Sequence, residues 1–229
     1  MAVYDGVRVL TWNLFHGRSV PPSRRELLPE FAAALASWEW DIAVLQEVPP
    51  WWPLPLAAAC SAHVRSVLTS RNALLPLRHA IAVRWPDVIK SNGGGANAIL
   101  VRASLGPATE HRSVRLALRP ERRRLHAVRL SDGVWVGNLH LSTVVERAQD
   151  ETRVAVSAIC RWADGAPVVL GGDFNLRELS LDGFETAAVR DIDYVFSRGI
   201  ARVGAFEVLD SGGVSDHPPL RVVLTPAAP

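Results

Sequence analysis

Short apolar runs recur along this chain, and several of them lead directly into a polar residue. Asn13, Glu47 and Asp173 each stand immediately after such a run. Apolar runs of this length are typical of buried strands, and none approaches the roughly 20 residues of a membrane-spanning helix. Functional sites in sheet proteins gather where strand ends converge, because a rigid scaffold there holds short side chains in a fixed geometry. The pattern therefore predicts a sheet protein with a polar site at its strand ends.

The composition is that of an ordinary globular chain. The 229 residues can form one substantial core, and 48% hydrophobic with 21% charged residues excludes disorder, collagen and coiled coil as the main state. Because no repeat or low-complexity linker divides the sequence, we predict one domain over residues 1–229. With no visible secretory signal and two cysteines, we expect a cytoplasmic protein without a membrane span. The net charge of +2 argues against a protein that coats long nucleic acids.

A first helix is predicted within residues 24–38. Ser23 and Glu26 have the spacing of a capping box, in which each side chain accepts a hydrogen bond from a backbone N–H that the helix leaves unpaired. Pro29 conflicts with that start, because a proline inside a helix removes a hydrogen bond and clashes with the preceding turn. The helix must therefore begin nearer Leu28 or bend.

Two further helical regions are predicted. Residues 54–85 are expected to be mostly helical, with an interruption near residues 69–72, and a helix should run from Thr143 to about Trp162, with Thr143 and Glu146 as a second capping box. A glycine-rich loop is predicted at residues 92–95, and strands at 7–12, 41–46, 98–101, 111–119, 122–130, 133–139, 167–170, 192–197 and 220–224. Hairpins mixed with single helices indicate an α/β sandwich with the sheets inside and the helices outside.

The polar residues near the strand ends share one chemistry, which is mostly carboxylate and amide with two imidazoles. They are Asn13, Glu47, His140, Asp173, Asn175, Asp193, Asp216 and His217. Oxygen-rich clusters of this kind suit a hard divalent cation such as Mg²⁺ or Mn²⁺. Two histidines would also allow zinc, but the His-x-x-x-His spacing of many zinc sites is absent from the sequence. Magnesium is therefore the expected ion.

Seven short motifs carry these residues. They are Thr11-Trp12-Asn13, Leu45-Gln46-Glu47, Asn97-Ala98-Ile99-Leu100, Asn138-Leu139-His140-Leu141, Gly171-Gly172-Asp173-Phe174-Asn175, Ile192-Asp193-Tyr194 and Ser215-Asp216-His217-Pro218. In this order the motifs resemble those of the endonuclease/exonuclease/phosphatase superfamily, the DNase I-like metal-dependent phosphohydrolases, over residues 11–218. The resemblance implies a four-layered α/β sandwich, in which helices flank two central, mostly antiparallel sheets.

The resemblance also implies roles for the acidic and amide residues. Glu47 would be the principal metal-binding carboxylate, with Asn13 and Asp216 in or near the metal shell. Asp173 would position or deprotonate the attacking water. Asn175 would donate a hydrogen bond to a non-bridging phosphate oxygen as charge develops there.

Two histidines would face the phosphate. In this superfamily the last histidine, here His217, pairs with an aspartate, and Asp193 matches that aspartate because it carries the Ile-Asp-Tyr pattern. The pairing would raise the pKa of the imidazole and keep it protonated toward an anion. His140 resembles the second histidine of the DNase I branch, which contacts phosphate or protonates the leaving oxygen. Each of the strand-end residues also has a plainer interpretation, as a surface acid, a turn residue or a structural histidine.

Several other positions keep two interpretations each. Asn97 either packs against the site or is purely structural. The polar group that several family members carry two residues after the first asparagine is missing here, so His16 either takes part of its role or is an ordinary loop histidine. Trp51 and Trp52 either form a wall that stacks a base or pack a loop. Residues 122–124 either reach phosphates or form a solvated strand edge.

The resemblance implies hydrolysis of a phosphoester by in-line attack of an activated water. No covalent intermediate is expected, because no serine or cysteine stands in a nucleophile motif. A small nuclease or general phosphodiesterase is the leading interpretation. A phosphatase acting on a small phosphorylated metabolite or a lipid headgroup is the alternative, and a non-catalytic binding module on the same fold is a third. We expect a monomer whose partner is its phosphoester substrate, with nucleic acid among the candidates.

Overall fold

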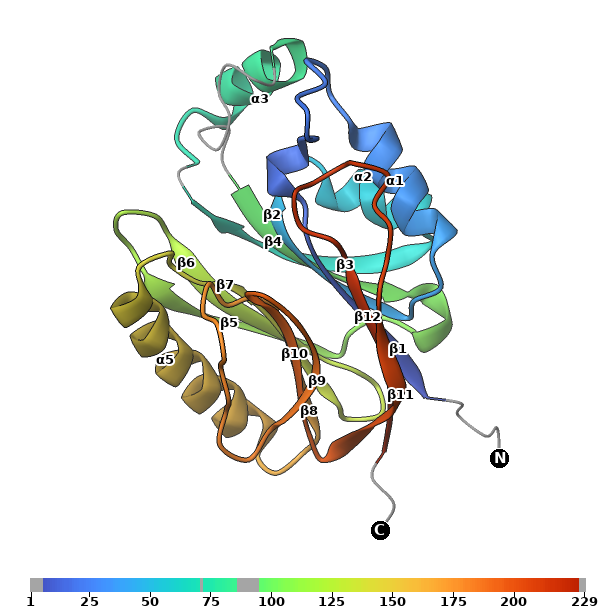
Figure 1. Ribbon diagram of the computed structural model, residues 1–229, viewed down its shortest axis with the longest axis vertical. Helices are drawn as coiled ribbons and strands as arrows, with labels where there is room; N and C mark the ends of the chain where they lie inside the picture. Colours follow the sequence, from blue (N-terminus) through green and yellow to red (C-terminus); the bar gives the residue numbers. More distant parts are fainter. Residues whose placement is uncertain (1–5, 71, 86–94, 227–229) are drawn as a thin grey trace.

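The computed structural model describes residues 6–70, 72–85 and 95–226, and these residues form a sandwich of two sheets with helices outside (Figure 1). Residues 92–94 of the predicted glycine-rich loop lie outside the described residues, whereas Gly95 begins a strand. The described strands form two six-stranded sheets, ordered β11-β12-β1-β2-β4-β3 and β5-β6-β7-β8-β10-β9. Neighbouring strands are antiparallel except for the parallel pairs β1–β2 and β7–β8.

The elements have the following bounds. The first sheet contains β1 Val7–Asn13, β2 Ile42–Val48, β3 Ala62–Thr69, β4 Gly95–Arg102, β11 Ile200–Val208 and β12 Leu220–Pro226. The second contains β5 Glu110–Ala117, β6 Arg123–Arg129, β7 Trp135–His140, β8 Val168–Asp173, β9 Glu185–Arg190 and β10 Asp193–Arg198. The helices are η1 Phe15–Gly17, α1 Leu28–Ser37, α2 Pro53–Ala59, α3 Leu75–Arg84, η3 Ala103–Leu105 and α5 Val145–Ala163.

Three apolar clusters separate four layers. Alternate residues of a strand point to opposite faces, so Val9 faces the second sheet while Leu10 faces α1 and α2. In the same way, Val169 faces the first sheet while Leu170 packs against α5. Figure 1 shows α5 on the outer face of the second sheet, and α1 and α2 over the first. The four-layered α/β sandwich is therefore confirmed.

The helix predicted over residues 54–85 is wrong in its central part. Residues 62–69 form β3, which pairs with β4 over its whole length, from Ala62 opposite Arg102 to Thr69 opposite Gly95. Hydrogen bonding to the sheet decides this conformation, because helix propensity is weak where a tertiary partner is present. Two strands that the periodicity did not predict, β9 and β11, complete the sheet edges.

Neither predicted capping box forms. Helix α1 begins at Leu28 with Pro29 in its first turn, which is the later start that Pro29 allowed as one of two alternatives. No side chain caps this helix. Glu26 instead accepts hydrogen bonds from the indole N–H groups of Trp51 and Trp52, at 3.2 and 3.0 Å. Helix α5 begins at Val145 and likewise lacks a side-chain cap. Among the described residues no helix is both long and apolar enough to cross a membrane.

Candidate active site

The site lies on the inner faces of the two sheets, at one end of the sandwich. Along β8, Val169 and then Asp173 face inward, and β7 and β1 show the same change from apolar to polar toward this end. The register brings these ends together, because Asn13 lies opposite Gln46 while Asp173 lies between His140 and Asp193. Strands β1, β2, β7 and β8 end here and β10 begins here, so the ends of neighbouring strands supply the polar residues.

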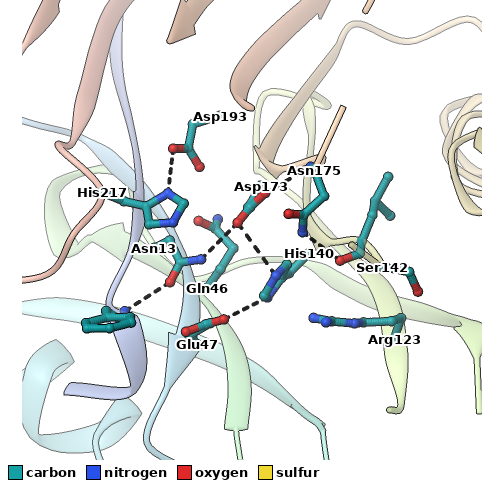
Figure 2. Close-up of polar contacts among 12 residues, drawn as sticks. Asn13, Gln46, Glu47, Arg123, His140, Ser142, Asp173, Asn175, Asp193 and His217 are labelled. Carbon is teal, nitrogen blue, oxygen red and sulfur yellow. Dashed lines mark hydrogen bonds and ion pairs between the residues drawn. The ribbon is translucent and has the colours of Figure 1, made fainter. Parts of the chain in front are cut away.

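A chain of polar contacts joins four of the predicted residues, Glu47, His140, Asp173 and Asn13 (Figure 2). Glu47 Oε1 lies 3.8 Å from His140 Nδ1, and His140 Nε2 lies 3.6 Å from Asp173 Oδ2. Asn13 Nδ2 donates a hydrogen bond of 3.0 Å to the same Asp173 oxygen. Glu47 belongs to the first sheet and Asp173 to the second, so the site closes across the sandwich.

Glu47 owes its position to a bulge. The register of β2 against β4 shifts between Leu45 and Val48, and Glu47 has a φ of 51°. A bulge of this kind turns one side chain away from the regular alternation. Burial raises the pKa of Glu47 to about 7, although the charges of Arg123 and His217 partly offset it.

Two glycines before Asp173 let the strands approach. Gly172 has a φ of 144°, and a Cβ there would lie 2.0 Å from the carbonyl oxygen of Leu139. A Cβ on Gly171 would lie 2.8 Å from Val44 Cγ2 of the opposite sheet. Glycine is thus required at position 172 by a neighbouring backbone and favoured at position 171 by the packed Val44 side chain.

Asp173 is held at both oxygens. Its Oδ2 accepts from Asn13, and its Oδ1 accepts a 2.9 Å hydrogen bond from the backbone N–H of Asn175. The Asn175 side chain donates to the carbonyl of Leu141 at 2.9 Å, which leaves its second amide hydrogen for another acceptor. Burial raises the pKa of Asp173 to about 7, and the charge of Asp193 adds to that shift.

His217 forms the expected pair with Asp193, at 2.7 Å between Nδ1 and Oδ2. Burial alone would lower the pKa of His217, but the hydrogen bond and charge of Asp193 outweigh it and raise the pKa to about 9. Two contacts fix the histidine backbone: the Trp12 indole donates to its carbonyl at 2.8 Å, and its N–H donates to Ser215 Oγ at 3.1 Å. The imidazolium is therefore charged and rigid at neutral pH.

His140 has the opposite charge state. Burial, together with the positive charges of Arg123, His16 and His217, lowers its pKa well below the usual value. The imidazole is therefore neutral at pH 7, and its contacts with Glu47 and Asp173 are not ion pairs. It can still donate one hydrogen bond and accept another.

Arg123 lies beside the candidate site. Of the two interpretations for residues 122–124, the solvated strand edge is wrong for Arg123, because β6 lies between β5 and β7 and the Arg123 side chain is buried. Figure 2 shows it extending toward His140, and Glu121 pairs with it at 3.1 Å. Three consecutive arginines give no local signal of which one faces inward.

The other open positions divide as follows. Trp52 is buried against Phe31, with ring centres 5.3 Å apart, and so packs the loop. Trp51 is only partly buried and stacks on His79 at 4.4 Å. Asn97 is fully buried on the inner face of β4. The side chain of Asp216 is 42% exposed, and its Oδ1 lies 3.8 Å from His217 Nε2.

The donor set fits a divalent cation. Asp173 is buried and Glu47 is partly buried, and loss of hydration raises the pKa of both carboxyls, so a bound cation would stabilise their charged forms. Within the described residues, Asp173, Asp193 and His217 also offer ligand atoms within 4.8 Å of one another, in a grouping that differs from the predicted Glu47, Asn13 and Asp216. His217 Nδ1 is already bonded to Asp193. A cation held by Asp173, Asp193 and His217 would therefore compete with this existing pair.

Solved structures share this architecture. An endonuclease/exonuclease/phosphatase from Beutenbergia cavernae DSM 12333 is 22% identical, with 96% of this chain and 71% of that chain covered and a TM-score of 0.73. TDP2 from C. elegans is 20% identical over 96% of this chain and 75% of that one, with a TM-score of 0.67. The mannosyl-6-phosphatase Bt3783 from Bacteroides thetaiotaomicron is 15% identical over 96% and 99%, also with a TM-score of 0.67. At these identities the likeness shows a common fold.

The family assignment comes from the sequence match. No curated protein matches this chain. The profile of the Endonuclease/Exonuclease/phosphatase family matches residues 10–217, which include all the site residues named above. The chain therefore belongs to the Endonuclease/Exonuclease/phosphatase family, whose members are phosphoester hydrolases that typically use a divalent metal.

Proposed function

We propose that this protein is a metal-dependent phosphodiesterase in which Asp173 activates a water for in-line attack on phosphorus. The observation that carries the proposal is the meeting of Glu47 and Asp173 through His140, where a metal-binding carboxylate and a base would flank one phosphate (Figure 2). A binding module would have no need for two carboxyls of raised pKa, the partly buried Glu47 and the buried Asp173, around one histidine.

Asp173 has the properties of a general base. A pKa of about 7 allows proton transfer at neutral pH, because an efficient base titrates near the working pH. Asn13 and the N–H of Asn175 each hold one carboxylate oxygen, so the group cannot rotate away from the water it would deprotonate. Positioning of this kind supplies part of the rate by removing the entropy of encounter.

Three side chains are suited to bind the phosphoryl oxygens. His217 would present an imidazolium, Asn175 its free amide hydrogen, and Arg123 a guanidinium from β6. His140 is neutral and would donate a hydrogen bond without adding charge, either to the phosphate or to the leaving oxygen. Hydrogen-bond donors held in this way stabilise charge that develops in the transition state.

Glu47, with Asn13 and Asp216, would hold the divalent cation. When bound, the cation supplies Lewis-acid polarisation of a phosphoryl oxygen and neutralises negative charge. The raised pKa of Glu47 is consistent with this role, since a nearby cation favours the charged form of a buried carboxylate.

The charge of the site favours diesters. With a divalent cation bound, the cations Arg123 and His217 and the acids Glu47, Asp173 and Asp193 would leave about one positive charge, which matches the single negative charge of a diester. Phosphatase action on a small metabolite or lipid headgroup is the second candidate, and the buried guanidinium of Arg123 is the feature that favours it, because an arginine fork can take the extra oxygen charge.

The test is hydrolysis of a bis-aryl phosphate, an aryl monophosphate, single-stranded DNA and a phospholipid panel, each with Mg²⁺ or Mn²⁺ and with a chelator. Diester cleavage that the chelator abolishes is expected. Asp173→Asn should lower kcat by about 10²–10⁴-fold without loss of stability. Asp191→Asn is the matched control, because Asp191 lies two residues before Asp193 but pairs with Arg177 on the surface.

Each other outcome changes the conclusion in a defined way. Faster cleavage of the monoester would support the phosphatase, and full activity of Asp173→Asn would refute the assigned base. Absence of hydrolysis with every substrate and metal would favour the binding module.

A further inference from the structure

The loop after β1 brings a histidine without an assigned role against Glu47. Phe15, His16 and Gly17 form η1 with φ values of 47°, 54° and 76°, all in the left-handed region. The side chain of His16 is 11% exposed, and its Nε2 lies 3.1 Å from Glu47 Oε2. His16 thus contacts the carboxylate that the proposed mechanism assigns to the metal.

This loop conformation is built by several contacts. The N–H of Phe15 donates to Asn13 Oδ1 at 3.0 Å, and the N–H of Gly17 donates to the Leu14 carbonyl at 2.7 Å. A Cβ at Gly17 would lie 2.4 Å from the Trp52 ring, so the loop is packed tightly against a buried side chain. The position of His16 therefore follows from the fold of β1 and the neighbouring helix.

Both residues of the contact have unfavourable backbones. His16 and Glu47 have φ values of 54° and 51°, in the left-handed region that residues with a Cβ rarely adopt. Strain of this kind persists where surrounding structure imposes it, and it clusters at ligand clamps. Here two strained residues, from different strand ends, direct a nitrogen and an oxygen toward the same point.

The spacing and chemistry of the two atoms suit one cation. Two ligands at about 2.1 Å from an octahedral ion, at right angles, lie about 3.0 Å apart. The observed 3.1 Å between His16 Nε2 and Glu47 Oε2 matches that separation. Magnesium prefers oxygen alone, whereas imidazole nitrogen raises the affinity for Mn²⁺ and the later first-row metals.

We propose that His16 Nε2 is a ligand of the divalent cation at Glu47, and that this nitrogen makes the site select Mn²⁺ over Mg²⁺. The inference rests on the metal dependence put forward above, and it adds a ligand and an ion preference. It also separates this chain from a purely oxygen-liganded site.

Pulsed EPR on the Mn²⁺-loaded protein tests the ligand directly, because a coordinated imidazole nitrogen gives a hyperfine coupling. The unmodified protein should show this coupling and His16→Asn should lose it, since asparagine tolerates a left-handed backbone but is shorter. His63→Asn, an exposed histidine on β3, is the matched control and should keep it. In calorimetric titrations His16→Asn should weaken Mn²⁺ binding at least about tenfold and Mg²⁺ binding much less.

Other results overturn the inference. These are absence of any histidine coupling in the unmodified protein, survival of the coupling in His16→Asn, and its loss in His140→Asn instead. If a cation still binds and supports hydrolysis in those cases, the proposed function stands and only the role of His16 fails. If neither Mn²⁺ nor Mg²⁺ binds the unmodified protein, both conclusions fail together.

Discussion

Asn138 is a buried amide that ties the two sheets together beneath the site. It lies on β7 with no exposed surface, and its Nδ2 donates to the carbonyls of Leu45 and Ala98 in the opposite sheet, both at 2.9 Å. Its Oδ1 accepts a 2.8 Å hydrogen bond from Gln46 Nε2. We predict that Asn138→Ala removes all three bonds and leaves a small polar cavity.

The magnitude follows from those contacts. Each buried hydrogen bond contributes about 1 kcal/mol net, and unpaired buried partners with a cavity add to the loss, so the free energy of unfolding should fall by about 3–5 kcal/mol. For a chain of this size that lowers the Tm by about 6–20 °C. Urea denaturation followed by circular dichroism measures the change, with Gln149→Ala on the exposed face of α5 as the control, expected within about 0.5 kcal/mol. A loss below about 1 kcal/mol for Asn138→Ala would refute the account of the amide as a link between the sheets.

Three further outcomes are expected. Gly172→Ala should lower the free energy of unfolding by more than about 3 kcal/mol in thermal unfolding, because the added Cβ would overlap a backbone carbonyl. Gly165→Ala is the control and should cost clearly less, because an added Cβ there has no atom within 4 Å. Equal losses in the two variants would contradict this prediction. Arg123→Gln should lower kcat/KM about 100-fold with an unchanged far-UV spectrum, and unchanged kinetics would remove Arg123 from the site. Burial lowers the pKa of His126 well below 6.5, so the unfolded chain binds the proton more readily and the free energy of unfolding should fall as the pH drops below about 6.5. His126 contributes up to about 1.4 kcal/mol per pH unit to this slope, and the buried His140 contributes in the same direction, so His126→Leu should reduce the slope without abolishing it; the same slope in both proteins would exclude His126 as one of its sources.

The strand-end residues could be predicted because two local signals coincide in them. A run of apolar residues indicates a buried strand, and a polar residue directly after it has no role in a core, as at Asn13 and Asp173. The four-layered fold followed from the order of motifs that carry these residues, and the structure confirms it. The assigned roles of these residues stay predictions, although the structure brings the side chains together.

Residues that depend on pairing were not predictable in the same way. Strand β3 was taken for helix because its own residues decide little, and its conformation comes from β4. Glu26 was expected to cap a helix, but its carboxylate accepts hydrogen bonds from two indoles of the segment before α2 instead. For Arg123 the sequence left two interpretations open, phosphate contact or a solvated sheet edge, because the place of a strand in its sheet is a property of strand order and cannot be read from one strand.

The sequence by itself determined which chemical groups this protein presents and in which order along the chain, because polar residues after apolar runs are a local pattern. Tertiary structure decided the distances and charge states that make those groups a site. The bulge at Glu47, the left-handed turn at His16 and the parallel pairing of β7 with β8 arise from contacts between segments far apart in the chain. The raised pKa values of Glu47 and Asp173 follow from burial between two sheets, and burial exists only once both sheets have packed.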